Sequence, residues 1–122
     1  MKRDMDYIRE LLLEIEEAPA EELWSREAVN PTPDLPRLTQ HLKLLQDAGL
    51  IDVEEHSVYL GGGELWYGVR LTWAGHEFLD TIRSETVWTE TKRRVTSTVG
   101  TVSIAVLSEV AKQVAKGLLG LP

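Results

Sequence analysis

One short segment carries the residues that come nearest to a metal-binding pattern. His76, Glu77 and Asp80 resemble the helical motif of zinc proteases, in which two histidines four residues apart bind the metal. Asp80 stands where the second histidine is needed, so a capping or packing role fits this segment better than a metal site. His41 and His56 are isolated, and no acid–base constellation surrounds them.

Two further features exclude other chemistry. The chain has no cysteine, which excludes disulfides, cysteine zinc sites and a thiol nucleophile. The glycines at 61–63 lack the Lys and Ser/Thr of a phosphate-binding loop, so they are predicted to form a turn. We therefore expect a protein that binds a macromolecule and is not an enzyme, with no metal and no cofactor.

The polar face of one predicted helix could instead read nucleic acid. Between Asp34 and Gly49, leucines at 35, 38, 42 and 45 recur at helical spacing, which leaves the opposite face polar. Arginine and glutamine suit contacts to phosphates and base edges. A solvated helix face is the alternative. The candidate DNA-binding residues are Arg37, Gln40, His41 and Lys43 in this helix, and Arg70 further along the chain.

Apolar periodicity predicts the elements that position this helix. Other helices are expected at about residues 4–17, 85–95 and 102–119, with one more that Thr72 would cap. Gly75 in that helix is expected to lie close to a neighbouring element.

Two strands are predicted to form a hairpin after the leucine-rich helix. They are residues 50–56 and the alternating run Leu65, Tyr67, Val69 and Leu71, whose apolar side must pack on the helices. The proline-rich segment 18–33 is expected to hold a short strand near residues 23–24 and a helical turn at 25–29. This order of elements predicts a mainly α protein with a small β-hairpin. We interpret it as a winged helix-turn-helix domain at 1–84 with a C-terminal helical extension at 85–122.

The last predicted helix carries an apolar face with the spacing of a coiled-coil seam. An isolated helix of this length is marginal in water, so the face must be buried. It either packs on its own domain or forms a homodimer, and attachment to a membrane surface is disfavoured because the polar face has few bases. The candidate dimerisation residues are Ile104, Leu107, Ala111, Val114 and Leu118.

The net charge of −7 is unevenly distributed. Residues 1–66 carry 15 acidic and 6 basic side chains, whereas residues 67–122 carry 5 and 7. Nucleic-acid binders usually present a basic surface, yet the predicted hairpin carries three glutamates and Arg70 as its only base. The basic run at 92–94 could bind phosphate, but such runs are more often solvated helix faces paired with acids.

Two motifs resemble those of winged-helix proteins. His-Leu-Lys-Leu-Leu at 41–45, followed by Gly-Leu-Ile at 49–51, resembles the end of a recognition helix and the first wing strand. Leu-Thr-Trp-Ala-Gly at 71–75 resembles the exit from the wing. More closely, the chain resembles the bacterial and phage family called domain of unknown function 2513. That resemblance rests on residues 1–6, both motifs, the continuation to Asp80, Trp88 and the Leu118-Leu119 ending. It covers nearly the whole chain and implies the fold and a regulatory setting, but no catalytic activity.

These observations favour a cytoplasmic, dimeric DNA-binding regulator of phage or mobile-element genes. No signal-peptide pattern and no run of eighteen apolar residues is present, so no membrane partner is expected. The alternative is a winged helix used as a protein-interaction module, which the acidic wing and its aromatic residues favour. A continuous positive surface on the outer side of residues 34–48 would support DNA binding, and a negative one would favour the interaction module.

Overall fold

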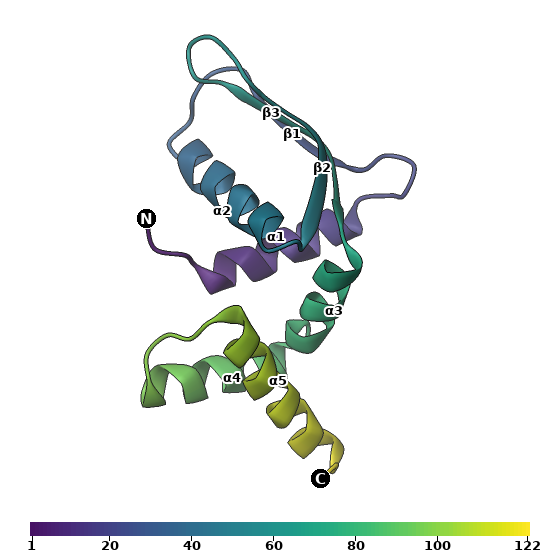
Figure 1. Ribbon diagram of the computed structural model, residues 1–122, viewed down its shortest axis with the longest axis vertical. Helices are drawn as coiled ribbons and strands as arrows, with labels where there is room; N and C mark the ends of the chain where they lie inside the picture. The colour runs from purple at the N-terminus through teal and green to yellow at the C-terminus, as the bar shows by residue number, and fades with distance from the viewer. The chain divides into compact units, whose positions relative to one another are not determined.

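The computed structural model describes residues 1–122 and contains five helices and one antiparallel sheet of three strands (Figure 1). The fold is mainly α and winged-helix-like with C-terminal helices, as the sequence predicts. The elements are α1 (Met5–Glu17), β1 (Trp24–Ala28), α2 (Leu35–Asp47), β2 (Ile51–Val58), β3 (Glu64–Leu71), α3 (Trp73–Ile82), α4 (Glu85–Thr98) and α5 (Ile104–Leu119).

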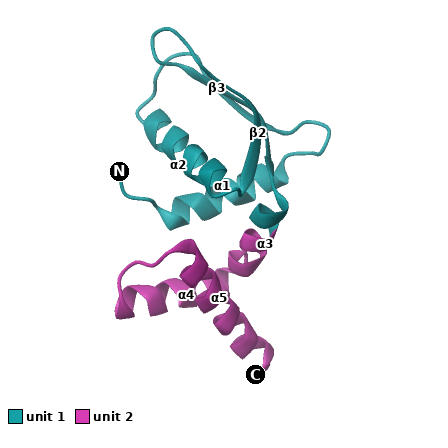
Figure 2. Cartoon of the chain, in the orientation of Figure 1, with its two compact units in different colours: residues 1–76 teal, residues 77–122 magenta.

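The chain forms two compact units, residues 1–76 and residues 77–122 (Figure 2). The boundary between them lies within α3. The domain boundary predicted after residue 84 stays a prediction, because a compact unit and an independently folding domain are different properties. Every helix is too short or too polar to span a bilayer.

Unit 1, residues 1–76, is built from two amphipathic helices and the sheet. The Asp4 side chain caps α1 by accepting a hydrogen bond from the Tyr7 backbone N–H at 3.1 Å. α2 begins with Pro36 in its first turn and is followed by Gly49 in the left-handed conformation. The apolar stripes of both helices are buried, at Ile8, Leu11, Leu12 and Ile15 in α1 and at Leu35, Leu38, Leu42 and Leu45 in α2.

β3 is the central strand, in the order β1-β3-β2. α1 contacts β1 and β3, and α2 contacts β2, so both helices cover the same face of the sheet (Figure 1). The other face is open to solvent, and the outer edges of β1 and β2 pair with no further strand.

The segment before α2 differs from the prediction. Residues 24–28 form β1, which pairs with β3, so the helical turn expected at 25–29 is wrong. A loop then leads to α2, closed by the Leu35 N–H donating to the Thr32 carbonyl at 3.1 Å. Pairing with a distant strand outweighs the weak local preference of this segment for a helical turn.

The alternation expected along β3 is also broken, at Gly68. The pairing of β1 with β3 slips by one residue between Trp24–Val69 and Arg26–Trp66, and Gly68 has φ +64°. An extra residue in the left-handed conformation is a β-bulge, so the side chains before it and those after it do not share one alternating pattern. Trp66 is therefore buried, whereas Tyr67 is 52% exposed, which is the reverse of the expected pattern.

Gly75 lies against the backbone of residue 50, which confirms the expected close approach. A Cβ atom built on Gly75 would lie 2.0 Å from the Leu50 carbonyl oxygen. The neighbouring Thr72 fixes this junction, because its hydroxyl donates to the Gly49 carbonyl and accepts from the Gly75 N–H. Thr72 thus caps α3, as predicted.

Unit 2, residues 77–122, contains the end of α3 and the whole of α4 and α5. Ser84 and Ser103 cap α4 and α5, and Gly120 in the left-handed conformation ends α5. α5 packs against α4. Of the predicted dimerisation residues, Leu107, Ala111 and Val114 are buried, Ile104 is half-buried and Leu118 is exposed. The seam is used within the chain, so a homodimer through it would require α5 to separate from its neighbours.

Candidate functional site

The outer face of α2 carries three of the residues predicted to bind DNA. Arg37, Gln40 and Lys43 are exposed, with Asp47 one turn beyond Lys43. Because Asp34 precedes the helix and Asp47 ends it, an acidic side chain stands at each end of the two basic ones. It is therefore not a continuous positive surface.

His41 does not lie on this face. The imidazole is 1% exposed, so it cannot contact a nucleic acid, and its inclusion among the candidates was wrong for this reason. Its Nε2 accepts a hydrogen bond from the Asp4 N–H at 3.0 Å, and its Nδ1 donates to the Arg37 carbonyl at 2.8 Å. These partners define a neutral ring with the proton on Nδ1. His41 therefore attaches the N-terminal segment to α2.

The two arginines among the candidates are both paired with carboxylates. Arg37 binds Asp4, and its guanidinium lies 4.1 Å from the centre of the Tyr7 ring. Arg70 on β3 binds Asp52, directly opposite on β2. A phosphate would have to displace these carboxylates to reach either guanidinium. Gln40 and Lys43 are thus the predicted DNA-binding residues that remain accessible without rearrangement.

The solvent face of the sheet is strongly acidic. A groove of about 780 Å³, the sheet groove, lies on it, lined by Leu65 and Tyr67 of β3 and by Glu27 and Glu54 of the neighbouring strands. Glu21 and Glu22 from the preceding loop also line it. Glu55 lies on the same face, because it pairs directly with Tyr67.

The side chain of Tyr59, at the tip of the hairpin, lies beside the glutamates of this face. The Tyr59 hydroxyl donates to a Glu27 carboxylate oxygen at 3.0 Å. Desolvation, this hydrogen bond and the charges of Glu27 and Glu55 all raise the pKa of Tyr59, because they disfavour a phenolate. The carboxylates of Glu27 and Glu55 thus place negative charge beside the phenol at this end of the sheet face.

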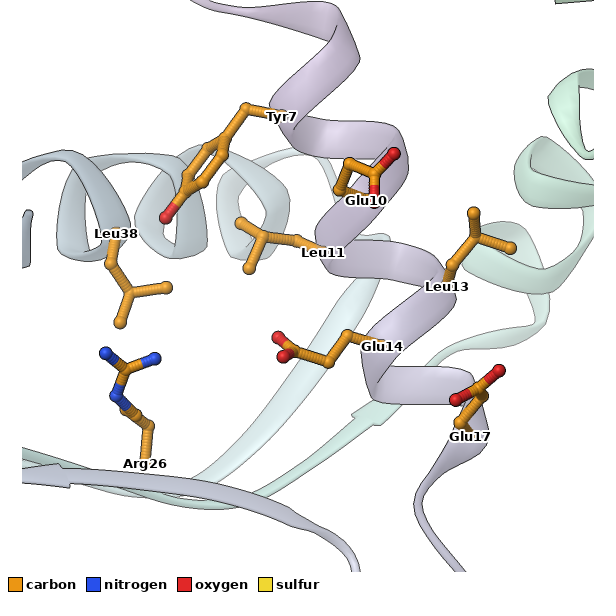
Figure 3. A pocket seen from close by; sticks show the side chains of 8 residues that line it. All are labelled: Tyr7, Glu10, Leu11, Leu13, Glu14, Glu17, Arg26 and Leu38. Carbon is orange, nitrogen blue, oxygen red and sulfur yellow. The ribbon is translucent and has the colours of Figure 1, made fainter. Parts of the chain in front are cut away.

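A second acidic groove, the α1 groove, lies between α1, β1 and α2 and has a volume of about 540 Å³ (Figure 3). Glu10, Glu14 and Glu17 lie along its α1 side at helical spacing, and Leu38 of α2 lines it. Figure 3 shows the Arg26 side chain reaching from β1 toward Leu38, opposite Glu14. This arginine makes the α1 groove less uniformly negative than the sheet groove.

A polar network joins α2 to the hairpin. Glu64 at the start of β3 accepts hydrogen bonds from the Thr39 hydroxyl at 2.7 Å and from His56 Nε2 at 2.6 Å. His56 stacks on Trp66, with 3.8 Å between ring centres. Burial alone would raise the pKa of Glu64, but the hydrogen bonds from His56 and Thr39 and the charges of His56 and Lys43 outweigh it and lower the pKa.

We expect Glu64→Gln to lower the free energy of unfolding by about 1–3 kcal/mol at neutral pH, because a charged acceptor for two donors is lost. A lowered folded-state pKa gives stability that is present above the ordinary pKa of 4.5 and is lost as the pH falls through the folded-state value. The difference between wild type and variant should therefore shrink below pH 4.5 in urea unfolding followed by tryptophan fluorescence. Glu55→Gln, an exposed carboxylate on β2, is the control and should change stability by less than about 0.5 kcal/mol. An equal loss in both variants would contradict this role.

The basic run of α4 in unit 2 is paired internally. Glu90 accepts hydrogen bonds from Arg93 at 2.6 and 3.0 Å and from Arg94 at 3.0 Å, and these bonds lower the pKa of Glu90 to about 2. Lys92 lies 5.6 Å from the centre of the Trp88 ring. This is the ion-paired helix face that the sequence offered as the alternative to a phosphate site.

Sequence reasoning recognised the acidic hairpin but missed the sheet groove. Glu54 and Glu55 belong to the hairpin, whereas Glu21, Glu22 and Glu27 reach the same face only because β1 pairs with β3. The signal that could have found them is the short run of residues 23–28 between two proline-containing segments, read as a strand throughout its length.

The fold and these surfaces define a small winged-helix-like protein with an acidic sheet face. The chain belongs to the family described as hypothetical protein (DUF2513), which matches residues 2–102. It is 35% identical over 124 residues to an uncharacterised protein of Haemophilus influenzae, an alignment that covers 98% of this chain and 99% of that protein. No solved structure matches the chain significantly.

Proposed function

We propose that this chain is a non-catalytic interaction module, whose unit 1 binds a basic segment of a partner protein on the solvent face of the sheet. The observation that carries the proposal is the sheet groove, which four glutamates line together with Leu65 and the half-exposed Tyr67. Aromatic and apolar groups ringed by one sign of charge suit a partner of opposite charge, because burial supplies affinity and charge supplies orientation.

The charge of unit 1 supports a cationic partner. Residues 1–76 carry 15 acidic and 7 basic side chains, a net charge of −8. Arg37 and Arg70 are each compensated by an aspartate. This field repels a phosphate backbone and attracts lysines and arginines over the range of the Debye length.

DNA binding is the second candidate, in the form of a regulator of phage or mobile-element genes. The observation in its favour is that Gln40 and Lys43 are exposed on α2, the helix that precedes the hairpin. Recognition helices of winged-helix proteins occupy this position. α2 and the sheet groove involve different residues, so variants can separate the two functions.

The test is fluorescence anisotropy at about 50 mM salt, a condition that favours charge contacts with DNA. The probes are a labelled peptide of alternating lysine and leucine and a labelled random DNA duplex. Two triple variants remove the same number of charges, one on the sheet face and one in the α1 groove. They are Glu27→Gln, Glu54→Gln, Glu55→Gln and, as the matched control, Glu10→Gln, Glu14→Gln, Glu17→Gln.

We expect the wild type to bind the peptide, and the sheet-face triple variant to bind it at least about tenfold more weakly. The α1 triple variant should lose less than about threefold, because it changes only the overall field. Tyr67→Ala should also weaken binding. If both triple variants lose the same amount of affinity for the peptide, net charge alone explains the binding, and the proposed site is contradicted. If the wild type instead binds the duplex, and Gln40→Ala and Lys43→Ala abolish that binding, the DNA-binding candidate is established.

A further inference from the structure

We infer that a second copy of this chain docks on a groove of unit 2 formed by the end of α3, the start of α4 and the C-terminal half of α5. This unit 2 groove has a volume of about 540 Å³. Val87 and Ala115 supply apolar lining, and Leu118 and Leu119 lie at its α5 end. The inference concerns assembly, so it goes beyond the proposed function and does not depend on it.

The end of α5 leaves apolar side chains uncovered beside the unit 2 groove. Leu118 is 61% exposed and Leu119 is 72% exposed, and Leu121 just beyond the helix is 56% exposed. Gly120 fixes this end, because its left-handed conformation lets the Leu121 N–H donate to the Lys116 carbonyl at 2.8 Å. The leucines are therefore held in place by a defined cap, and burying them against an apolar groove is favourable.

The charges along the unit 2 groove make it complementary to itself. Glu77 and Asp80 line it from α3, whereas Lys112 and Lys116 line it from α5. Asp80 is paired with Arg83, and Lys112 with Glu109, but Glu77 and Lys116 form no ion pair within the chain. A two-fold axis through the groove places the α3 side of one copy against the α5 side of the other. Glu77 of each copy then meets Lys116 of its partner, twice per dimer.

This arrangement selects a second copy over a partner of one charge. A strongly basic or acidic segment would meet like charge on one side of the unit 2 groove, whereas an identical surface turned by a two-fold axis meets opposite charge on both sides. The interface shares only Leu118 with the predicted seam, whose central residues Leu107, Ala111 and Val114 are buried within the chain. The small apolar area predicts a weak, concentration-dependent dimer.

The experiment is analytical ultracentrifugation of the full chain over about a hundredfold range of concentration, where mass action reveals weak association. Glu77→Lys alone and Lys116→Glu alone each place like charges together twice in a homodimer. Each should weaken self-association by at least about tenfold. The double variant, and an equimolar mixture of the two single variants, restore opposite charges at both contacts and should associate like the wild type. Gln113→Glu, on an exposed part of α5 outside the groove, is the control and should change little.

A chain that stays monomeric over the whole range would overturn the inference. So would single variants that associate like the wild type, because the interface would then lie elsewhere. A mixture of the single variants that stays monomeric, while the wild type dimerises, would also overturn it. Both substituted residues line the surface of the groove, and recovery in the mixture separates a charge effect at the interface from a loss of folding.

Discussion

Gly75→Ala is expected to lower the free energy of unfolding by about 3 kcal/mol, the upper end of the usual cost of overpacking. The added methyl group would lie 2.0 Å from the Leu50 carbonyl oxygen, which is backbone and cannot rotate away. Relief requires α3 to move from the hairpin, which breaks the hydrogen bonds that Thr72 makes to Gly49 and Gly75. Thermal or urea unfolding measures the loss.

Gly117→Ala in α5 is the matched control. A Cβ atom there meets nothing within 4 Å, so only helix propensity changes, and stability should rise by up to about 1 kcal/mol. A Gly75→Ala protein as stable as the wild type would show that α3 does not approach residue 50 so closely. The same loss in both variants would point to a general intolerance of helix substitutions instead.

Trp66→Ala is expected to cost about 3–5 kcal/mol, whereas Tyr67→Ala should cost less than about 1 kcal/mol. Trp66 is 1% exposed and stacks on His56, so its removal leaves a large cavity. Tyr67 is 52% exposed on the solvent face. Simple alternation along β3 predicts the reverse order of effects. This pair of variants therefore shows which of the two side chains faces the core.

Urea unfolding of both variants decides the matter. A larger loss in Tyr67→Ala than in Trp66→Ala would mean that the bulge at Gly68 is absent and that the strand alternates as its sequence alone suggests. Trp66→Phe should lose less than Trp66→Ala, because the phenyl ring keeps most of the buried surface and the indole N–H makes no hydrogen bond in the fold.

Local patterns predicted the helices well because each carries its own evidence. The leucine stripe of residues 35–45 and the apolar face of residues 8–15 both repeat at the helical period. The ends of the helices are marked as well, by Ser, Thr or Asp caps at the N-terminus and by a glycine after the C-terminus. The close approach at Gly75 was also predictable, because a glycine inside a helix with apolar neighbours usually has a packing reason.

The set of exposed side chains on α2, the candidate DNA-binding helix, was only partly predictable from the sequence. Arg37 and Lys43 were correctly expected on the exposed side of α2, but His41 was not recognised as buried. Its burial depends on two hydrogen-bond partners, one of which, Asp4, lies 37 residues away. Partners at such separation follow from packing, and no pattern within residues 34–48 encodes them.

The sequence by itself determined the winged-helix-like class of this protein, its helices, its acidic character and the absence of cysteine chemistry. These properties depend on composition and on periodicities within about fifteen residues, which a single chain displays directly. The tertiary structure alone decided that β1 joins the sheet and that a bulge at Gly68 breaks the alternation of β3. It also decided that the glutamates of three segments share one groove, and that the α5 seam is filled from within the chain. These properties arise from pairings between distant segments, whose free energy is gained only when the whole unit packs.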